Sequence, residues 1–332
     1  MSEKSQFPLD SYGVLNTITA YQQAAAVSTG VETGLFTALA SGRQTSVDVA
    51  EACETHPVPT RSLLDALSGM GFLHRDIGDN AEPHYRLAGA AVELAAGGAL
   101  VDLVRKEAYL ATQWQSLEKT VRTGTPIIAP WRTRLADDPS ATRSFLRALV
   151  TLARLIGADL TRVPELGEGR DVIDAGGGLG SYAVPLAAGG ARVRLVELAT
   201  VAEWCREELE GSAIEVIEAD LLTDVALGVE ESSADSVLFS HLLHDLSDED
   251  ALVVLRKAVD ALRPGGAVVI LEIPGDAPLP LGGLFDLMMQ IETPGRARQS
   301  DELIQLLAAA GFENIHRADV ADPNLVLIGE RS

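Results

Sequence analysis

Cysteine is scarce in this chain of 332 residues, which holds only Cys53 and Cys205. Two cysteines at this separation match neither a metal-ligand pattern nor a disulfide framework. The pattern therefore argues against a disulfide-dependent secreted domain and indicates a reducing compartment. We expect a cytoplasmic protein.

Long hydrophobic runs are also missing. The longest candidate, residues 87–104, is interrupted by Glu93 and Asp102. Because a membrane span needs about 20 mostly apolar residues, the sequence predicts no transmembrane helix and no membrane partner. Residues 1–20 contain charged side chains and no apolar stretch followed by a cleavage site, so we expect no signal peptide.

Basic residues are few relative to acidic ones. The sequence has 26 Lys and Arg against 48 Asp and Glu, for a formal net charge of -22. A surface this acidic repels phosphate backbones, which argues against a nucleic-acid partner. Hydrophobic residues make up 47% of the chain, enough for a full core. The length suggests about two domains.

Residues 12–165 have the periodicity of helices. In residues 1–100, three short helical segments precede two short strands around a polar turn at 76–83, which is a winged-helix pattern. We expect Thr45 or Ser46 to cap the second helix and Thr60 the third. The predicted helices cover 34–42, 47–56 and 61–73, and the second strand covers 84–88. This region contains eleven acidic and five basic residues, which favours a dimerisation domain over a DNA-binding one.

Residues 101–165 are expected to form a helical bridge. The most amphipathic part is 140–160, in which large apolar side chains recur on one helix face. Those side chains are Phe145, Leu149, Leu152 and Ile156. The bridge either packs two domains together or forms one wall of a substrate pocket between them.

Residues 166–332 alternate short apolar strands with helices. The strands are rich in Val, Ile and Leu on both faces, as in a buried parallel sheet. The predicted strands cover 171–176, 191–198, 214–220, 236–240 and 265–274, with helices at 181–190, 201–210, 248–262 and 301–312. A β-hairpin over 313–320 and 324–330 closes the region. This order predicts a doubly wound α/β sheet.

A glycine-rich loop follows the first of these strands, in the segment 174–180. Gly176, Gly178 and Gly180 allow a sharp turn and a close approach to a ligand. Glu197 ends the second strand and is placed to bind a ribose diol. These features indicate a nucleotide, either NAD or S-adenosylmethionine (SAM).

Three observations favour SAM over NAD. Asp174 can lie near the cationic amino-acid end of SAM. Asp220 and Leu221, after the third strand, can bind the adenine amine and cover the adenine face. The Tyr-x-x-x-Lys motif of short-chain dehydrogenases is absent from the sequence.

The sequence resembles SAM-dependent O-methyltransferases of the caffeate/acetylserotonin type, in their bacterial branch. The resemblance covers nearly the whole chain, and its most specific part is LLHDLSDEDALVVLRKAVDALRPGGAVVILE, residues 242–272. It implies a winged-helix dimerisation domain over 1–100, a bridge over 101–165 and a class I SAM-binding domain over 166–332. It also implies a homodimer that methylates a small hydroxylated natural product.

The resemblance also assigns roles within the site. His244 matches the catalytic base, and Glu272 matches the carboxylate that orients it. Their strands are expected to be neighbours, so both side chains lie at the carboxyl edge of the sheet. His241 is expected to be pocket wall or core. We add Ser240 to the cofactor-binding residues and expect no metal; the substrate candidates are Phe145, Leu149, Asp286 and Arg298.

Two departures from the family pattern leave other chemistries open. Leu246 replaces an aromatic residue that covers the adenine. Arg298 aligns with a second carboxylate beside the histidine, and it either clamps an anionic substrate or lies exposed at a helix terminus. The alternatives are C- or N-methylation, a hydroxylation or pericyclic reaction without methyl transfer, or a SAM-sensing or DNA-binding regulator.

Overall fold

The computed structural model describes residues 10–78, 81–319 and 323–332. Residues 1–9 of the segment tested for a signal peptide, residues 79–80 of the predicted turn and Val320 of the predicted hairpin lie outside these ranges. The chain divides into two compact units, Met1–Leu110 and Ala111–Ser332. Helix α6 (Val101–Trp114) contains the boundary, and the 101–165 bridge stays a prediction. None of the described helices is long and apolar enough to cross a membrane.

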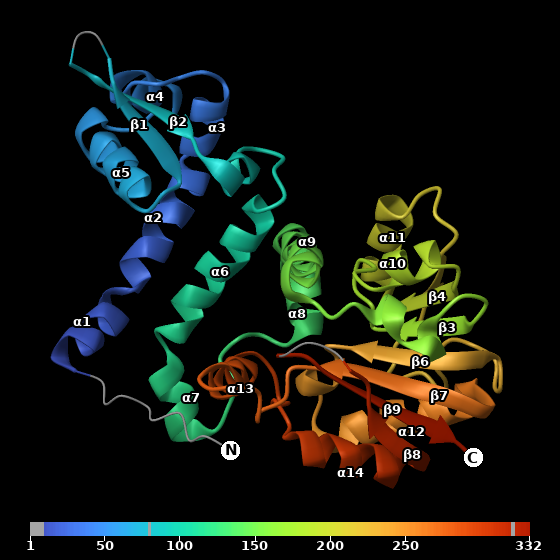
Figure 1. Ribbon diagram of the computed structural model, residues 1–332. Helices are drawn as coiled ribbons and strands as arrows, with labels where there is room; N and C mark the ends of the chain where they lie inside the picture. Colours follow the sequence, from blue (N-terminus) through green and yellow to red (C-terminus); the bar gives the residue numbers. More distant parts are fainter. Residues whose placement is uncertain (1–9, 79–80, 320–322) are drawn as a thin grey trace. The chain divides into compact units, whose positions relative to one another are not determined.

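The first unit combines helices with a two-stranded antiparallel sheet (Figure 1). Its elements before α6 are α1 (Ser11–Thr19), α2 (Tyr21–Glu32), α3 (Leu35–Ala40), α4 (Ser46–Ala52), α5 (Pro57–Gly69), β1 (Leu73–Ile77), β2 (Pro83–Leu87) and η1 (Gly89–Leu94). Phe36, Leu64 and Tyr85 are at most 1% exposed and form its core. These side chains come from three different elements, so the core ties the helices to the sheet.

One helix cap in this unit is as expected and one is not. Thr45 accepts a hydrogen bond from the Asp48 amide at 3.2 Å and caps α4. The prediction that Thr60 caps the third helix is wrong, because α5 begins three residues earlier at Pro57 with His56 as its cap. Proline lacks an amide hydrogen and has a helical φ, so it fits the first turn of a helix.

The second unit is built on a seven-stranded sheet of order β5-β4-β3-β6-β7-β9-β8. Its strands are β3 (Asp171–Ala175), β4 (Arg192–Glu197), β5 (Glu215–Glu218), β6 (Ala234–Ser240), β7 (Leu262–Glu272), β8 (Phe312–Arg317) and β9 (Leu325–Arg331). The first five are parallel neighbours, and β9 joins β7 and β8 antiparallel. The predicted doubly wound sheet with a closing hairpin is confirmed.

Helices cover both faces of this sheet (Figure 1). Those of the second unit after α6 are α7 (Leu117–Thr123), α8 (Trp131–Asp137), α9 (Pro139–Ile156), η2 (Leu160–Arg162), η3 (Pro164–Leu166), α10 (Ala183–Ala188), α11 (Ala199–Glu208), η4 (Leu243–Asp245), α12 (Asp248–Ala261), α13 (Leu281–Glu292) and α14 (Ser300–Ala310). Val172 packs in the core cluster with α10 and α11, and Ile173 in the cluster with α12 and α14. Adjacent strand residues thus enter opposite cores, as the period of two requires.

The buried face of α9 differs from the expected one. Its buried residues are Thr142, Leu146, Ala148 and Thr151. Leu149 is 36% exposed and Ile156 is 55% exposed. The buried residues lie on both sides of the predicted apolar face, and Phe145 and Leu152 of that face are half-buried.

Candidate active site

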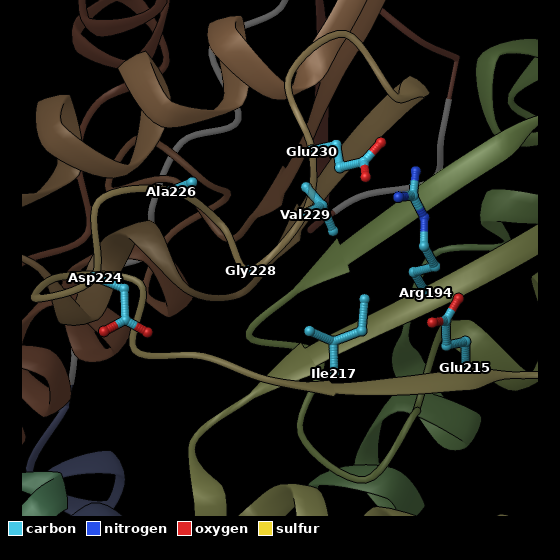
Figure 2. A pocket seen from close by; sticks show the side chains of 8 residues that line it. All are labelled: Arg194, Glu215, Ile217, Asp224, Ala226, Gly228, Val229 and Glu230. Atoms are coloured by element: carbon cyan, nitrogen blue, oxygen red, sulfur yellow. The ribbon is translucent and has the colours of Figure 1, made fainter.

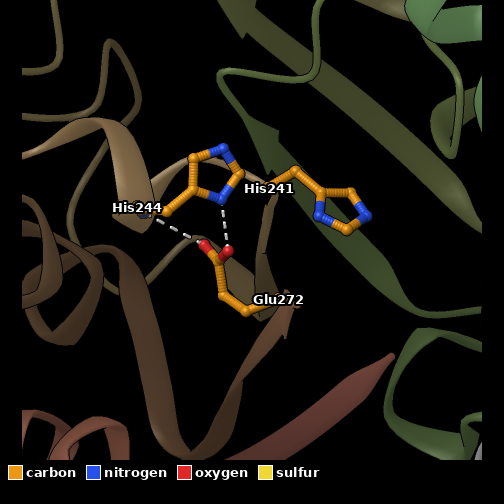
Figure 3. Close-up of side chains that lie close together, drawn as sticks. All are labelled: His241, His244 and Glu272. Atoms are coloured by element: carbon orange, nitrogen blue, oxygen red, sulfur yellow. Dashed lines mark hydrogen bonds and ion pairs between the residues drawn. The ribbon is translucent and has the colours of Figure 1, made fainter. Parts of the chain in front are cut away.

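The centre of the site is a pair formed by His244 and Glu272 (Figure 3). Glu272 ends β7 and His244 lies in η4, just after β6; these two strands are parallel neighbours. The Nδ1 atom of His244 lies 2.5 Å from Oε2 of Glu272. The other carboxylate oxygen accepts hydrogen bonds from the amides of Leu243 at 2.9 Å and His244 at 3.4 Å. Glu272 therefore fixes both the His244 ring and the backbone at Leu243 and His244, a segment that we call the histidine loop.

Electrostatics in this pair favour the charged forms. Burial alone would lower the pKa of His244, but the charges of Glu272, Asp245 and Glu292 outweigh it and raise the pKa to about 9. Burial would raise the pKa of Glu272, but His244 outweighs it and the pKa is lowered. In the free protein near neutral pH, the pair is an imidazolium beside a carboxylate.

Two residues that sequence reasoning missed surround this pair. Glu292, at the end of α13, is only 7% exposed and adds negative charge near His244. The ring of Phe285 meets the His244 ring edge-on, with centroids 5.1 Å apart. Neither residue lies in a recognisable motif, because α13 reaches the site through tertiary packing.

Arg298 braces the histidine loop from within the protein. It is 3% exposed, so the expectation of an exposed side chain is wrong. Its Nη1 donates to the Leu243 carbonyl at 2.5 Å, its Nη2 to the Leu246 carbonyl at 2.8 Å, and its Nε to Asp248 at 2.8 Å. All three guanidinium nitrogens have acceptors in the protein, so the structure gives no support to the alternative of a substrate clamp.

Asp174, at the carboxyl end of β3, is the second buried carboxylate of the site. It is 0% exposed, and neither oxygen forms a hydrogen bond of normal length and angle with a described residue. Burial and the nearby Glu197 carboxylate raise its pKa to about 7, although the backbone amide of Ala183 opposes this rise. A buried carboxylate without a good hydrogen-bond partner destabilises the folded protein unless a bound ligand interacts with it. The cationic amino-acid end of SAM suits this group.

The glycine loop fits a closely bound ligand. Gly176 has a φ of 73°, and a Cβ atom there would lie 3.1 Å from both methyl groups of Leu242. Leu221, the expected adenine cover, lies over the same glycine, 3.6 Å from that Cβ position. The loop amide of Gly178 donates to Glu197 Oε1 at 2.9 Å. The residues present therefore suit the adenosine of SAM at this edge of the sheet.

Asp220 has a partner that the sequence did not indicate. Arg132 of α8 binds both oxygens, with Nη1–Oδ2 at 2.5 Å and Nη2–Oδ1 at 2.6 Å. The hydrogen bonds with Arg132 lower the pKa of Asp220 well below its usual range. Its carboxylate is thus engaged at the place where the adenine amine was expected.

The remaining candidates are placed as follows. Ser240 ends β6 and is 9% exposed. Asp286 on α13 accepts from the Ala297 amide at 3.0 Å and from Gln290 at 2.9 Å, so it anchors the segment before α14. Phe145 packs against Trp131, with ring centroids 6.0 Å apart. No described contact brings Asp286 to His244.

His241 lies beside the pair (Figure 3) and has an unusual backbone φ of 53°. Burial lowers its pKa to about 4, so it is neutral near pH 7. Ligand atoms of His241, His244 and Glu272 lie within 4.8 Å of one another, a spacing that a metal ion can use. The hydrogen bond between His244 Nδ1 and Glu272 Oε2 already engages one atom of each of these two residues.

An open hollow elsewhere in the unit has a different character (Figure 2). It is lined by Arg194, Ile217, Asp224 and Glu230, among others. Arg194 lies in the first half of β4, whereas Glu197 is at the carboxyl end. Asp224 accepts a hydrogen bond from the Asp220 amide at 2.8 Å, so the hollow extends to the loop of the expected adenine residues.

Family models match both regions of the chain. A model described as an O-methyltransferase domain matches residues 114–313, and one described as an O-methyltransferase dimerisation domain matches residues 15–97. The fold and the site define a SAM-dependent methyltransferase. More particularly, the chain belongs to the O-methyltransferase family with this pair of domains.

Individual relatives are similar to most of the chain. The mitomycin biosynthesis 6-O-methyltransferase of Streptomyces lavendulae is 28% identical over 87% of this chain and 85% of its own. The aclacinomycin 10-hydroxylase RdmB of Streptomyces purpurascens is 31% identical over 82% of this chain and 77% of its own. The solved structure of PigF with SAH has a TM-score of 0.84 and 25% identity, covering 98% of this chain and 100% of that one.

Proposed function

We propose that this protein methylates a hydroxyl oxygen on a small aromatic or polyketide-like natural product, with His244 as the general base. The observation that supports this most directly is the 2.5 Å contact between His244 Nδ1 and Glu272. It fixes the tautomer of the ring and leaves Nε2 as the atom that exchanges a proton with the substrate. One relative is named for a hydroxynaphthoate, which belongs to this chemical class, and another is named for mitomycin biosynthesis.

Different residues of the chain bind SAM, accept the proton and contact the acceptor. SAM, when bound, supplies an electrophilic methyl group on a sulfonium. We propose that Asp174, the 176–180 loop, Glu197, Asp220, Leu221 and Ser240 hold it. His244 takes the hydroxyl proton as the oxygen becomes a nucleophile, Glu272 stabilises the resulting imidazolium, and Phe145 and Leu149 contact the acceptor. Alignment of the two reactants supplies much of the remaining acceleration.

The product decides this proposal. The protein is incubated with methyl-labelled SAM and a panel of hydroxylated aromatics, and products are identified by mass and by NMR of the labelled carbon. We expect an O-methyl signal together with release of S-adenosylhomocysteine (SAH). A label on carbon or nitrogen, or a product that gains a hydroxyl and no methyl, would exclude O-methylation.

Hydroxylation without methyl transfer is the second candidate. It rests on one observation, the 31% identity to a relative named as a 10-hydroxylase. The same product assay separates the two functions, because a hydroxylated product carries no label.

We also propose a homodimer formed through residues 12–100. Helix α1 has no buried residue, and large apolar side chains stand on it and on the start of α2. Tyr12 is 70% exposed, Ile18 63% and Tyr21 68%. A surface of this kind marks an interface. Light scattering should give twice the monomer mass for the full chain, and a monomer at micromolar concentration would contradict the proposal.

A further inference from the structure

Gly178, in the glycine loop, is held by one side chain at its amide and another at its carbonyl. The amide donates to Glu197 Oε1 at 2.9 Å, and the carbonyl accepts a hydrogen bond from the Cys205 thiol, with Sγ 2.9 Å away. Gly178 has a φ of 58°, in the left-handed region that glycine adopts without steric cost. Two consecutive peptide groups of the loop are therefore oriented by side chains of β4 and α11.

The Cys205 thiol is suited to this contact. Its side chain is 0% exposed. Burial, with the nearby carboxylates of Glu197 and Asp174, raises the pKa of Cys205 to about 12, so the group keeps its hydrogen near neutral pH and can donate it. No backbone amide of the described residues donates to the Gly178 carbonyl. The thiol therefore supplies the hydrogen bond that this shielded carbonyl needs.

The Gly178 amide in turn helps to orient the Glu197 carboxylate. Oε1 accepts from Gly178 and Oε2 accepts from the Leu198 amide, both at 2.9 Å. Each carboxylate oxygen has a second lone pair, so the two oxygens can still accept from the two hydroxyls of a ribose. Because Gly178 holds Oε1, a displacement of its peptide groups would also displace this acceptor.

The same loop carries the buried carboxylate that lacks a good partner in the protein. Asp174 forms no hydrogen bond of normal length and angle with a described residue. A Cβ atom on Gly177 would collide with the Asp174 carboxylate, so this glycine leaves room for it. The conformation at Gly177 and Gly178 therefore affects both carboxylates that are expected to bind SAM, Asp174 and Glu197.

We infer that Cys205 is a positioning residue for cofactor binding. Its thiol holds the Gly178 peptide, and through Gly178 it orients the Glu197 carboxylate toward the ribose of SAM. The inference rests on the proposed function, because it takes Glu197 as a ligand of the ribose. A cysteine that only filled space in the core would affect the free energy of unfolding and leave the cofactor affinity unchanged.

Calorimetric titration of the full-length protein with SAH, together with chemical denaturation, separates the two roles. We expect Cys205→Ala to weaken SAH binding by about 3- to 10-fold, the scale of one lost hydrogen bond. Cys205→Ser retains a donor and should bind SAH within about twofold of wild type. Val201→Ala is the matched control, because Val201 is 0% exposed on the same helix and packs in the same core cluster. It should lose stability and keep the wild-type SAH affinity.

A double-mutant cycle with Glu197→Ala tests whether the effect passes through Glu197. In the Glu197→Ala background, Cys205→Ala should change SAH affinity by less than about twofold. Wild-type affinity in Cys205→Ala, equal losses in the alanine and serine variants, or additive losses in the double variant would overturn the inference. Methyl transfer by the wild-type protein would then leave the proposed function standing. Wild-type affinity in Glu197→Ala would overturn both the inference and the ribose contact on which it rests.

Discussion

Asp174 and Glu272 are both buried carboxylates at the carboxyl ends of parallel strands, but the protein surrounds them with different hydrogen-bond donors. Glu272 accepts hydrogen bonds from His244 and from two loop amides, and its pKa is lowered. Asp174 forms no hydrogen bond of normal length and angle with a described residue, and its pKa is raised to about 7 even though the backbone amide of Ala183 opposes the rise. The protein itself supplies the hydrogen-bond donors of Glu272, whereas a bound ligand is expected to supply the partner of Asp174. The contrast separates a positioning residue from a binding residue.

The largest expected effect comes from removing the base that Glu272 positions. We expect His244→Ala to lower turnover by about 10²–10⁴-fold, the usual contribution of a general base. SAM affinity should be nearly unchanged, because His244 follows β6 and is not part of the glycine loop. Steady-state kinetics and SAM titration check both points. Full activity in this variant would mean that alignment alone drives the transfer.

Removing the charge of Asp174 tests whether this carboxylate binds SAM. We expect Asp174→Asn to weaken SAM binding by about 10- to 100-fold, the range for a lost charge-assisted hydrogen bond. The rate at saturating SAM should change much less. Calorimetric titration with SAM and SAH measures the effect, and wild-type affinity would remove Asp174 from the binding site.

The pH dependence should report the His244 pair. Because Glu272 and its neighbours raise the pKa of His244 to about 9, the base is mostly protonated at pH 7. The value of kcat/KM should therefore rise with pH up to about 9 and then level off. In Glu272→Gln the inflection should move toward lower pH, since the main carboxylate is gone. An inflection that stays in place would show that Glu272 does not set the pKa.

The smallest effect is expected for Arg132. This side chain is 52% exposed and binds Asp220, and exposed ion pairs contribute about 0–1 kcal/mol. We expect Arg132→Ala to change SAM affinity by less than about fivefold. Tighter binding would indicate that Arg132 competes with the adenine for Asp220, and weaker binding that the pair supports the site. A loss greater than tenfold would contradict a peripheral role.

The sequence was sufficient for parts of the site that depend on topology. His244 and Glu272 follow neighbouring strands, so the order of the parallel sheet brought them together, and Asp174 and Gly176 follow from the same rule. Residues on loops and short helices could not be placed this way. Arg298 turns inward to the Leu243 and Leu246 carbonyls, because tertiary packing decides its direction.

The protein's own groups form hydrogen bonds with Glu272, whereas the partner of Asp174 is expected to be a bound ligand. The free energy of unfolding of the ligand-free protein tests this difference most directly. Chemical denaturation at pH 8, where Asp174 is mostly ionised, compares Asp174→Asn and Glu272→Gln with wild type. Asp174→Asn should raise the free energy of unfolding by about 1–3 kcal/mol, because an unpaired buried charge is removed. Glu272→Gln should lower it by about 1–3 kcal/mol, because one of the two acceptor oxygens becomes an amide donor that faces the buried donors and the charge beside His244 is lost. Loss of stability in both variants would show that Asp174, like Glu272, is stabilised by the protein's own groups.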